Sequence, residues 1–574
     1  MPVQRAVVMT TLLLASLMLV GYGVFAQEPT EETPSEETPS EEIPPPFPTA
    51  TVDASPLPEF PTATASLPPT IESTLDGIPE STIQFRPSPT ITPTPAPAPN
   101  VAMLTCHAEP RWTHFINVRR GPSSNWGIIR NLAHTLENQE MRVFGRNEDG
   151  DWFHVVLPEP YEDEVGWVWL ENINVFGACD DLPVTEENPE ITIDEVPDAP
   201  APIPYPDWVG DNVTLGPFDR AFLVKPGILY IRREVPGDEK DRMQAHIVLY
   251  DLDAPELEVG VTIGAVPDIE GVTVSQMARD AGAYAAITGD YYAGNYFPQG
   301  ITVIDGEVVT APKHRSAFGI TKDGEPFIGY FTNEWSWPAR VTAENGEVIP
   351  LQLMNVPCQR AWLCIYSHHR ANRLPASYAG VRVLVDENFE VLEIVDNEGI
   401  DIPEGHYVLR GGDAAGQWLR DNVEIGDTLE IDLPTEPDWR DFDSVISGGP
   451  RIVIDGEYWR ECHPEEELVL CEEFDDDHRI RHTGPQTIPR AAVGINEGDN
   501  IVYTVMVEGY DVEDSNGAKQ DELAAMFIEF GATQAMEFDG GGSATFYMGQ
   551  GSISDHGLEG ERRISNSLLF FWND

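Results

Sequence analysis

The sequence predicts an α+β protein, with a large C-terminal domain of mixed sheets and internally repeated strand-hairpin units, preceded by a small β-barrel. Short runs of alternating apolar and polar residues, typical of strands, recur from Cys106 onward. The pattern Ile-Asp-Gly-Glu, followed later by Arg-x-Ala-x-Gly-Ile, occurs twice, with its arginines at Arg315 and Arg490. Helical periodicity is confined to a few segments, which makes the domain predominantly β.

The N-terminus has the features of an export signal. One positive charge at Arg5 precedes a charge-free run over residues 6–26, and Val24-Phe25-Ala26 fits a small-x-small cleavage site. We therefore expect residues 1–26 to be a signal peptide and the protein to be secreted or extracytoplasmic. An uncleaved N-terminal membrane anchor is the alternative, because the apolar run is about as long as a membrane span requires.

Two segments have the composition of linkers. Residues 27–100 repeat Pro, Thr, Ser and Glu without apolar periodicity, so we expect a disordered spacer, and residues 183–220 form an acidic, Pro-rich connector. The whole chain carries 97 acidic against 34 basic residues. This charge disfavours binding to nucleic acid and to anionic membranes, so contact with a membrane is expected only through the N-terminal segment.

The six cysteines are even in number, and in an exported protein they predict three disulfides. Sequence neighbours suggest the pairs Cys106–Cys179, Cys358–Cys364 and Cys462–Cys471. A zinc site is the rival interpretation for the last pair, because Cys462, His463, Cys471, His478 and His482 lie close in sequence. Their irregular spacing and an oxidising compartment favour the disulfide.

Residues 101–182 contain short strand-like runs separated by turn residues. Asn117-Val118-Arg119 with Gly121-Pro122, then Asp149-Gly150-Asp151-Trp152, then Gly166-Trp167-Val168 occur in the order found in the bacterial SH3 family. The segment resembles that family, which implies a small β-barrel and a cell-wall or peptide ligand. A purely structural role for Trp152, Trp167 and Trp169 in the core remains an equal alternative.

Residues 221–574 form the predicted C-terminal domain. Its two repeated units differ by an acidic insertion from about Arg460 to Gln486. One helix is predicted from Ser515-Asn516-Gly517 through Phe530, because apolar residues there are spaced three and four apart, and "VSQMARDAGA" predicts another. A strand follows each helix.

Both of these strands end in an acid beside glycine. "YAAITGD" places Thr288 and Asp290 on one face, and "TQAMEFD" places Glu537 and Asp539 on one face, because side chains alternate along a strand. Asp539 is followed by three glycines, which permit a ligand to approach the backbone closely. Ligand sites are common where strands end in glycine-rich turns. An ordinary turn at the glycines, and structural roles for both arginines, remain open.

The C-terminal domain resembles the phosphodiester glycosidases, the family of the N-acetylglucosamine-1-phosphodiester α-N-acetylglucosaminidases. The segments that match, in family order, are "AITGDYYAG", "PQGITVIDGE", "HRSAFGI", "VISGGPRIVIDGE", "PRAAVGI", "FDGGGSAT" and "ERRISNSLLFF". Two positions depart from the family pattern: an Asn-Gly-Gly-Phe-Phe-like segment reads Thr288-Gly289-Asp290-Tyr291-Tyr292, and an Asn is replaced by Glu537.

The resemblance implies a hydrolase that cleaves the glycosidic bond of sugar-1-phosphodiesters in extracellular glycans or wall polymers. Such a reaction needs a carboxylate for the oxocarbenium-like sugar or for water, and a cation for the departing phosphate. We expect Asp539 as the carboxylate, Glu537 or Asp290 as its partner, and Arg490 as the cation. The predicted substrate contacts are Arg315, Thr288, Gly289, Gly540, Gly541, Gly542, Ser543, Thr545 and Asn566, with backbone N–H groups of residues 540–543 facing the anion.

Two other functions stay open. The departures at Thr288 and Glu537 suit a non-catalytic wall- or glycan-binding protein. The carboxylates of Asp290, Glu537 and Asp539 suit a divalent cation such as Ca²⁺, and hence a metal-dependent phosphodiesterase that breaks the phosphorus–oxygen bond. The acidic segment "DVEDSNGAKQDE" does not fit an EF-hand loop, because its glycine falls at the seventh place from Asp511 and not at the sixth.

Overall fold

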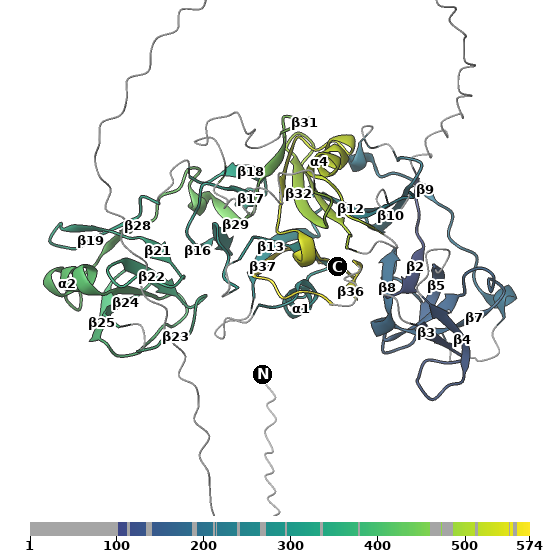
Figure 1. Ribbon diagram of the computed structural model, residues 1–574, viewed down its shortest axis with the longest axis horizontal. Coiled ribbons are helices and arrows are strands. Elements are labelled where there is room, and N and C mark those ends of the chain that lie inside the picture. Colours follow the sequence, from purple (N-terminus) through teal and green to yellow (C-terminus); the bar gives the residue numbers. More distant parts are fainter. Residues whose placement is uncertain are drawn as a thin grey trace, which may run out of the picture. The chain divides into compact units, whose positions relative to one another are not determined.

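A computed structural model describes the chain from residue 101 to residue 573 (Figure 1). The described part has gaps at 112–114, 134–139, 186–191, 211–212, 214, 238–241, 265–270, 293–295, 333–336, 377–378, 460–471, 473–485, 511–514, 550 and 555–559. The predicted signal peptide, the linker over 27–100 and the Cys462–Cys471 pair therefore lie outside the described residues. Within these residues, no helix has both the length and the apolar character of a membrane span.

The predicted N-terminal domain contains one antiparallel sheet of seven strands, ordered β4-β3-β7-β6-β5-β2-β8. The strands are β2 (Cys106–Pro110), β3 (Phe115–Arg119), β4 (Ile128–Ala133), β5 (Met141–Arg146), β6 (Trp152–Val156), β7 (Val165–Trp169) and β8 (Ile173–Gly177). Trp167 is fully buried, whereas Trp169 is 41% exposed, so only the first is a core residue. The expected Cys106–Cys179 disulfide is confirmed. Membership of the SH3 family stays a prediction.

The C-terminal part is built from several sheets, the largest of which has eight strands in the order β10-β11-β12-β33-β32-β34-β30-β31. These strands are β10 (Asp219–Lys225), β11 (Ile228–Val235), β12 (Met243–Asp251), β30 (Arg451–Ile454), β31 (Glu457–Tyr458), β32 (Arg490–Asn496), β33 (Ile501–Val507) and β34 (Gln534–Glu537). The connector before it contributes β9 (Ile203–Pro204), which pairs with β1 (Val101–Ala102).

Five consecutive strands of the first sheet, β31-β30-β34-β32-β33, have the same order as a second sheet, β16-β15-β29-β17-β18. Its strands are β15 (Thr302–Ile304), β16 (Glu307–Thr310), β17 (Ser316–Thr321), β18 (Pro326–Tyr330) and β29 (Phe442–Ser447). The hairpins β15–β16 and β30–β31 turn through Asp305-Gly306 and Asp455-Gly456, with φ values of 50° and 76°, and 52° and 76°. Asp-Gly favours such a turn, because both of its central residues need positive φ.

The third sheet, ordered β13-β37-β14-β35-β36, carries the N-terminal half of the candidate site. Its strands are β13 (Leu257–Ile263), β14 (Ala285–Thr288), β35 (Phe546–Met548), β36 (Gly551–Ser552) and β37 (Asn566–Trp572). The helix α1 (Val274–Ala281) packs against this sheet, and the Thr273 side chain caps it by accepting from the N–H of Gln276.

The second predicted helix begins later than expected. Helix α4 spans Gln520–Glu529, with Lys519 at its N-cap, so the prediction of a start at Ser515 was wrong. Ser515 is buried and instead bonds the backbone of Gln244 and Glu508. Gly517 has a φ of 105°, which a helix does not permit. Helix α4 packs against β30 and β31.

Residues 337–433 follow β18 and precede β29, and are called the inserted region below. It holds β19 (Arg340–Thr342), β20 (Val348–Pro350), β21 (Leu353–Met354), β22 (Leu363–Ser367), β23 (Arg373–Leu374), β24 (Val381–Val385), β25 (Val391–Asp396), β26 (Ile400–Asp401), β27 (Tyr407–Gly411), α2 (Asp413–Asn422) and β28 (Glu430–Asp432). The expected Cys358–Cys364 disulfide is confirmed here. Val303 and Val445 of the second sheet share a core with Leu363 and Val383 of this region.

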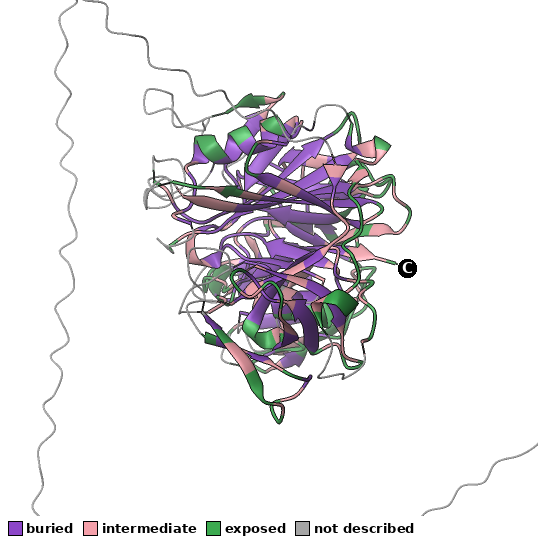
Figure 2. Cartoon of the chain, turned by 90° about the vertical axis from the view of Figure 1, so that its right-hand side faces the viewer, coloured by how far each residue is buried: buried purple, intermediate pink, exposed green. Residues whose placement is uncertain are grey.

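The main core joins the three sheets of the C-terminal part. Met536 and Val493 from the first sheet, Ile446 from the second and Ile287 and Leu568 from the third pack into one buried cluster. Figure 2 shows the central strands as largely buried, with most exposed residues on loops, outer helix faces and outer strands. The fold is mostly β with few helices, which agrees with the predicted α+β class.

Candidate functional site

The ends of β14 and β34 meet, although more than half of the C-terminal part separates them in sequence. The N–H of Asp539 donates to the carbonyl of Gly289 over 2.9 Å. The Thr288 hydroxyl donates to the carbonyl of Ser543 over 2.5 Å and accepts from the N–H of Thr545 over 2.9 Å. The two helix-strand-acid segments recognised in the sequence therefore form one site at the boundary between two sheets.

Glycine is required at position 289 for this approach. A Cβ there would lie 2.4 Å from Cδ1 of Ile446 and 2.5 Å from Oδ1 of Asn566, both of which are buried. Real Cβ contacts are never this short in a packed interior, so any side chain would push the two sheets apart. Asn566 accepts from the N–H of Asp290 over 2.7 Å, which fixes the residue that follows.

Asp290 is fully buried beside Arg315. Its Oδ2 accepts from the N–H of Gly300 over 2.7 Å, and its Oδ1 lies 3.7 Å from Nη1 of Arg315. Burial raises the pKa of this carboxyl above its usual value of 3.8, while Arg315 and the Gly300 N–H act in the opposite direction. The carboxyl of Asp290 therefore retains its proton to a higher pH than an exposed aspartate.

Glu537 and Arg490 form a second buried pair. Nη1 of Arg490 lies 2.8 Å from Oε2 of Glu537, and neither side chain is exposed. Gln520, in the first turn of α4, donates to Oε1 of Glu537 over 2.8 Å. Arg490 also donates from Nε to the carbonyl of Ala518 and from Nη2 to the carbonyl of Gln486. The guanidinium is thus bound by the protein on every side.

Tyr291 links the two pairs. Its hydroxyl donates to the carbonyls of Gly449 and Phe538, over 3.0 and 3.3 Å, and its ring centroid lies 5.4 Å from Cζ of Arg315. Burial raises its pKa well above 10, with Glu537 and then Asp539 adding to the rise and Arg315 and Arg490 opposing it. The carboxylates of Glu537 and Asp539 and both arginines therefore lie within electrostatic reach of one phenol.

The glycine loop after Asp539 is a short 3₁₀ turn, η6 (Gly541–Ser543). Gly541 has a φ of 60°, which favours glycine. Its N–H donates to the carbonyl of Pro489, and the N–H of Ser543 donates to the carbonyl of Gly540. The prediction that all of residues 540–543 offer N–H groups to an anion is therefore wrong for Gly541 and Ser543, which donate within the protein.

Several polar and aromatic groups around this loop are accessible to solvent. Asp539 is half-buried, Arg562 is exposed, and Tyr292 is half-buried with its ring stacked on Tyr296 at 5.0 Å between centroids. A Cβ on Gly542 would lie 2.4 Å from Nη2 of Arg562, so the guanidinium lies directly across the loop. Burial and then Asp539 raise the pKa of Tyr292, and Ser543 and Arg562 oppose this, which places these groups around one hydroxyl.

The predicted catalytic and substrate-binding residues lie in the two arginine–acid pairs, in the glycine loop and the segment before β35, or along the ends of β14, β34 and β37. Two buried polar atoms, Oγ1 of Thr545 and Nδ2 of Asn566, have no hydrogen-bond partner among the described residues. Sequence reasoning missed Tyr291, Gln520 and Arg562. Tyr291 and Arg562 lie within the quoted motifs, but Gln520 gave no signal, because it is an ordinary helix residue.

The acidic insertion contributes one described residue, Glu472, which was also missed. Its buried carboxylate accepts from the N–H and hydroxyl of Ser316, over 3.2 and 2.6 Å, and from the N–H of Arg451 over 3.0 Å. It thereby joins the first residues of β17 and β30. The cysteines and histidines of the rival zinc site lie outside the described residues.

The three site carboxylates do not form a metal-ligand group. Among the described residues, the one group of three such side chains with ligand atoms within 4.8 Å of one another is Glu307, His368 and His369. Asp290 and Glu537 instead face arginines. Binding of Ca²⁺ at the site stays a prediction.

A separate cavity of about 400 Å³ adjoins the seven-stranded sheet. Its lining includes Arg142, Phe144, Asp180, Asp198 and Val224, from the N-terminal domain, the connector and β10.

A comparison with known families finds one match within the C-terminal part. Residues 377–571 match the phosphodiester glycosidase family. This phosphodiester glycosidase segment contains Arg490, Glu537 and Asp539, whereas Asp290 and Arg315 precede it in the chain. No curated protein matches the sequence significantly.

Solved structures similar to this chain include a hypothetical protein from Synechocystis, with 19% identity and a TM-score of 0.50, over 62% of this chain and 64% of that one. A putative exported protein from Burkholderia pseudomallei has 20% identity and a TM-score of 0.47, over 57% and 74%. The auto-inhibited catalytic domain of zebrafish N-acetylglucosamine-1-phosphodiester α-N-acetylglucosaminidase has 15% identity and a TM-score of 0.33, over 62% and 84%. The first similarity supports a shared fold.

Proposed function

We propose that the protein is an exported hydrolase that cleaves the glycosidic bond of sugar-1-phosphodiesters in extracellular glycans or wall polymers. The observation that carries the proposal is the position of Asp539. It is a half-buried carboxylate, held between two sheets by its backbone bond to Gly289, with the exposed Arg562 across the adjacent loop. The family match over residues 377–571 supports the reaction class.

The chemistry needs few groups. A phosphate monoester is a good leaving group, so its departure from the anomeric carbon requires little protonation. What the protein must supply is a negative charge for the oxocarbenium-like sugar, or a base for water, and a cation for the phosphate. Asp539 is the accessible carboxylate of the site and takes the first role.

Arg562 takes the second role. Arg490 was predicted to hold the phosphate, but it is fully buried, and its donors engage Glu537, Ala518 and Gln486. A substrate phosphate would have to displace these bonds. Arg562 is exposed and lies against Gly542, where a guanidinium can meet phosphate oxygens in a bidentate manner.

The buried pairs position the site. The Arg315 guanidinium, paired with Asp290, lies over the ring of Tyr291, whose hydroxyl donates to the carbonyls of Gly449 and Phe538. Phe538 directly precedes Asp539, so this network sets the direction of the catalytic carboxylate. The stacked Tyr292 and Tyr296 offer aromatic faces to a sugar ring.

The finer organisation belongs to the same proposal. We infer that the signal peptide directs export and that residues 101–182 form an SH3-like module which binds a wall ligand. We also infer that the second sheet and the matching part of the eight-stranded sheet descend from one repeated unit. The disulfides Cys106–Cys179 and Cys358–Cys364 suit an oxidising compartment outside the cytoplasm.

The experiment measures free sugar released from a panel of sugar-1-phosphodiesters by the wild type and by Asp539→Asn and Arg562→Ala. The matched control is Arg440→Ala, because Arg440 is also an exposed arginine, pairs with Asp438 and is not one of the site residues. We expect both site variants to lose turnover and the control to retain it. Unchanged turnover in Asp539→Asn would refute the assigned carboxylate.

Isotopically labelled water distinguishes the rival chemistry. Glycosidic cleavage places the label in the sugar, whereas a metal-dependent phosphodiesterase places it in the phosphate. Saturable binding of the panel without product would instead identify a non-catalytic glycan-binding protein.

A further inference from the structure

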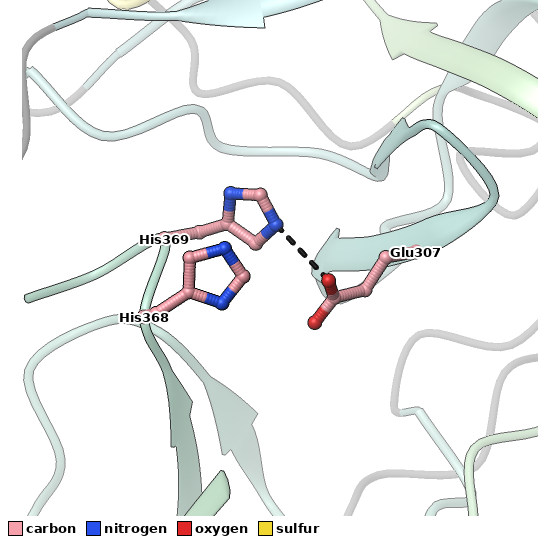
Figure 3. A group of neighbouring side chains, drawn as sticks. All are labelled: Glu307, His368 and His369. Atoms are coloured by element: carbon pink, nitrogen blue, oxygen red, sulfur yellow. Dashed lines mark hydrogen bonds and ion pairs between the residues drawn. The ribbon is translucent and has the colours of Figure 1, made fainter. Parts of the chain in front are cut away.

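A second cluster of chemically active side chains lies at the junction of the second sheet and the inserted region. Glu307 is the first residue of β16, and His368 and His369 follow β22 directly. One ligand atom from each of the three lies within 4.8 Å of the others. Figure 3 shows the two imidazole rings side by side, with the Glu307 carboxylate facing them.

The distances suit a single small cation. Nε2 of His369 lies 3.2 Å from Oε2 of Glu307. Two ligands that each bind zinc at roughly 2.0–2.2 Å in a tetrahedron are separated by about 3.3 Å, so these two atoms already have the spacing of ligands on one ion. The rings of the two histidines are 4.0 Å apart between centroids, and a ring nitrogen of His368 lies within 4.8 Å of the other two ligand atoms.

The surroundings also suit a metal centre. Tyr407 donates from its hydroxyl to Oε1 of Glu307 over 2.9 Å, which leaves Oε2 directed at the histidines. Outer hydrogen bonds of this kind orient the ligands of metal sites. Nδ1 of His368 is buried and has no hydrogen-bond partner among the described residues. A bound cation accounts for this otherwise costly nitrogen.

The donor types select the ion. Two imidazole nitrogens and one carboxylate oxygen are intermediate in softness and suit Zn²⁺, whereas Ca²⁺ and Mg²⁺ prefer sites made of oxygen alone. All three side chains are half-buried, so ions have access from solvent.

We propose that Glu307, His368 and His369 bind Zn²⁺ and that the ion fastens the inserted region to the second sheet. Asn355 already makes a bond across this junction, because its Nδ2 donates to the carbonyl of Val309 in β16 and to the hydroxyl of Ser367 in β22. Zinc adds a second, stronger bond between the same two strands. This proposal concerns a structural ion and does not rest on the proposed glycosidase activity.

The cluster also connects to the candidate site. Thr310, the last residue of β16, donates to the carbonyl of Gly300, and the N–H of Gly300 donates to Asp290. The zinc therefore anchors the far end of the hairpin that supports Asp290, without touching the site.

The test titrates Zn²⁺ into the chelator-treated full chain by calorimetry, and repeats it with Glu307→Gln, His369→Ala and Tyr407→Phe. The control is His107→Ala, because His107 and Glu140 also form a histidine–carboxylate pair, 2.5 Å apart, but have no second histidine in a three-ligand group among the described residues. Zinc held by Cys462, His463, Cys471, His478 and His482 would persist in every one of these variants.

We expect the wild type and His107→Ala to bind one more equivalent of Zn²⁺ than His369→Ala. Glu307→Gln should weaken this equivalent by more than about 100-fold, and Tyr407→Phe by about 10-fold, since loss of an outer partner costs less than loss of a ligand. Zinc should raise the thermal midpoint of the wild type but not that of Glu307→Gln. Equal stoichiometry and affinity in Glu307→Gln and the wild type would overturn the proposal, and leave an ordinary ion pair. Glu307→Gln keeps the shape of the side chain, so circular dichroism of this variant controls for folding.

Discussion

If Arg490 stabilises the fold, its replacement should lower the free energy of unfolding. If it binds substrate instead, its replacement should lower turnover and leave stability nearly unchanged. Arg490 and Glu537 are both completely buried, and their Nη1 and Oε2 atoms are 2.8 Å apart. Arg490→Ala removes this ion pair and the bonds to Ala518 and Gln486, while the amide of Gln520 still donates to Glu537. Removal of one member of a buried pair costs about 3–5 kcal/mol, because the other charge stays desolvated.

The double variant Arg490→Met with Glu537→Gln removes both charges together. We expect it to unfold at a higher urea concentration than Arg490→Ala, because no carboxylate is left without its cation. Tryptophan fluorescence in urea measures the midpoints. The comparison pair is Arg440 and Asp438, whose side chains are 50% and 48% exposed, and whose loss should cost under about 1 kcal/mol.

The result that refutes this reasoning is specific. If Arg490→Ala keeps its unfolding free energy within about 1 kcal/mol of the wild type while sugar release collapses, the guanidinium acts on the substrate, and its buried contacts are of minor importance.

Three further predictions address other parts of the molecule. Asp539→Asn should lower turnover by about 100-fold or more without moving the urea midpoint, and a parallel loss of stability would contradict its assignment as a catalytic group. Asp290 has a pKa raised above 3.8 in the folded protein, so its stabilising contribution is complete below pH 3.8 and is lost as pH rises through the raised value. The stability of the wild type relative to Asp290→Asn should therefore fall as pH rises from about 4, and urea midpoints that differ by a constant amount at every pH would argue against this. Replacement of Cys106 and Cys179, which are 73 residues apart, should lower the free energy of unfolding by about 4 kcal/mol. Replacement of Cys358 and Cys364, which are 6 residues apart, should lower it by about 2 kcal/mol. Equal losses of stability in calorimetry would contradict this dependence on loop length.

The predictable parts of the fold are those that neighbouring residues in the sequence determine. The hairpins at Asp305-Gly306 and Asp455-Gly456 follow from turn residues that accept positive φ. The start of α4 was mispredicted, because Ser515 has the chemistry of a helix cap but uses its hydroxyl to bridge Gln244 and Glu508, contacts that the local sequence does not encode.

The candidate site was predictable only in part, for a related reason. Asp290 and Asp539 were recognisable because each ends a strand that follows a helix. The importance of Tyr291 depends on the carbonyls of Gly449 and Phe538, which are far from it in sequence. The same holds for the burial of Arg490, because exposure depends on tertiary packing, and a sequence does not distinguish a buried arginine from one at the surface.

The position of β14 between β37 and β35 limits how far the chain can be shortened. A fragment trimmed to residues 377–571 keeps both neighbours but removes the strand that separates them, and it also strips β12 from β33. Several rows of unpaired backbone amides would then face water and invite other chains to pair with them. We therefore expect such a fragment to aggregate when it is produced alone. An activity assay on the fragment would then find no turnover, because the fold is incomplete and not because the protein lacks activity.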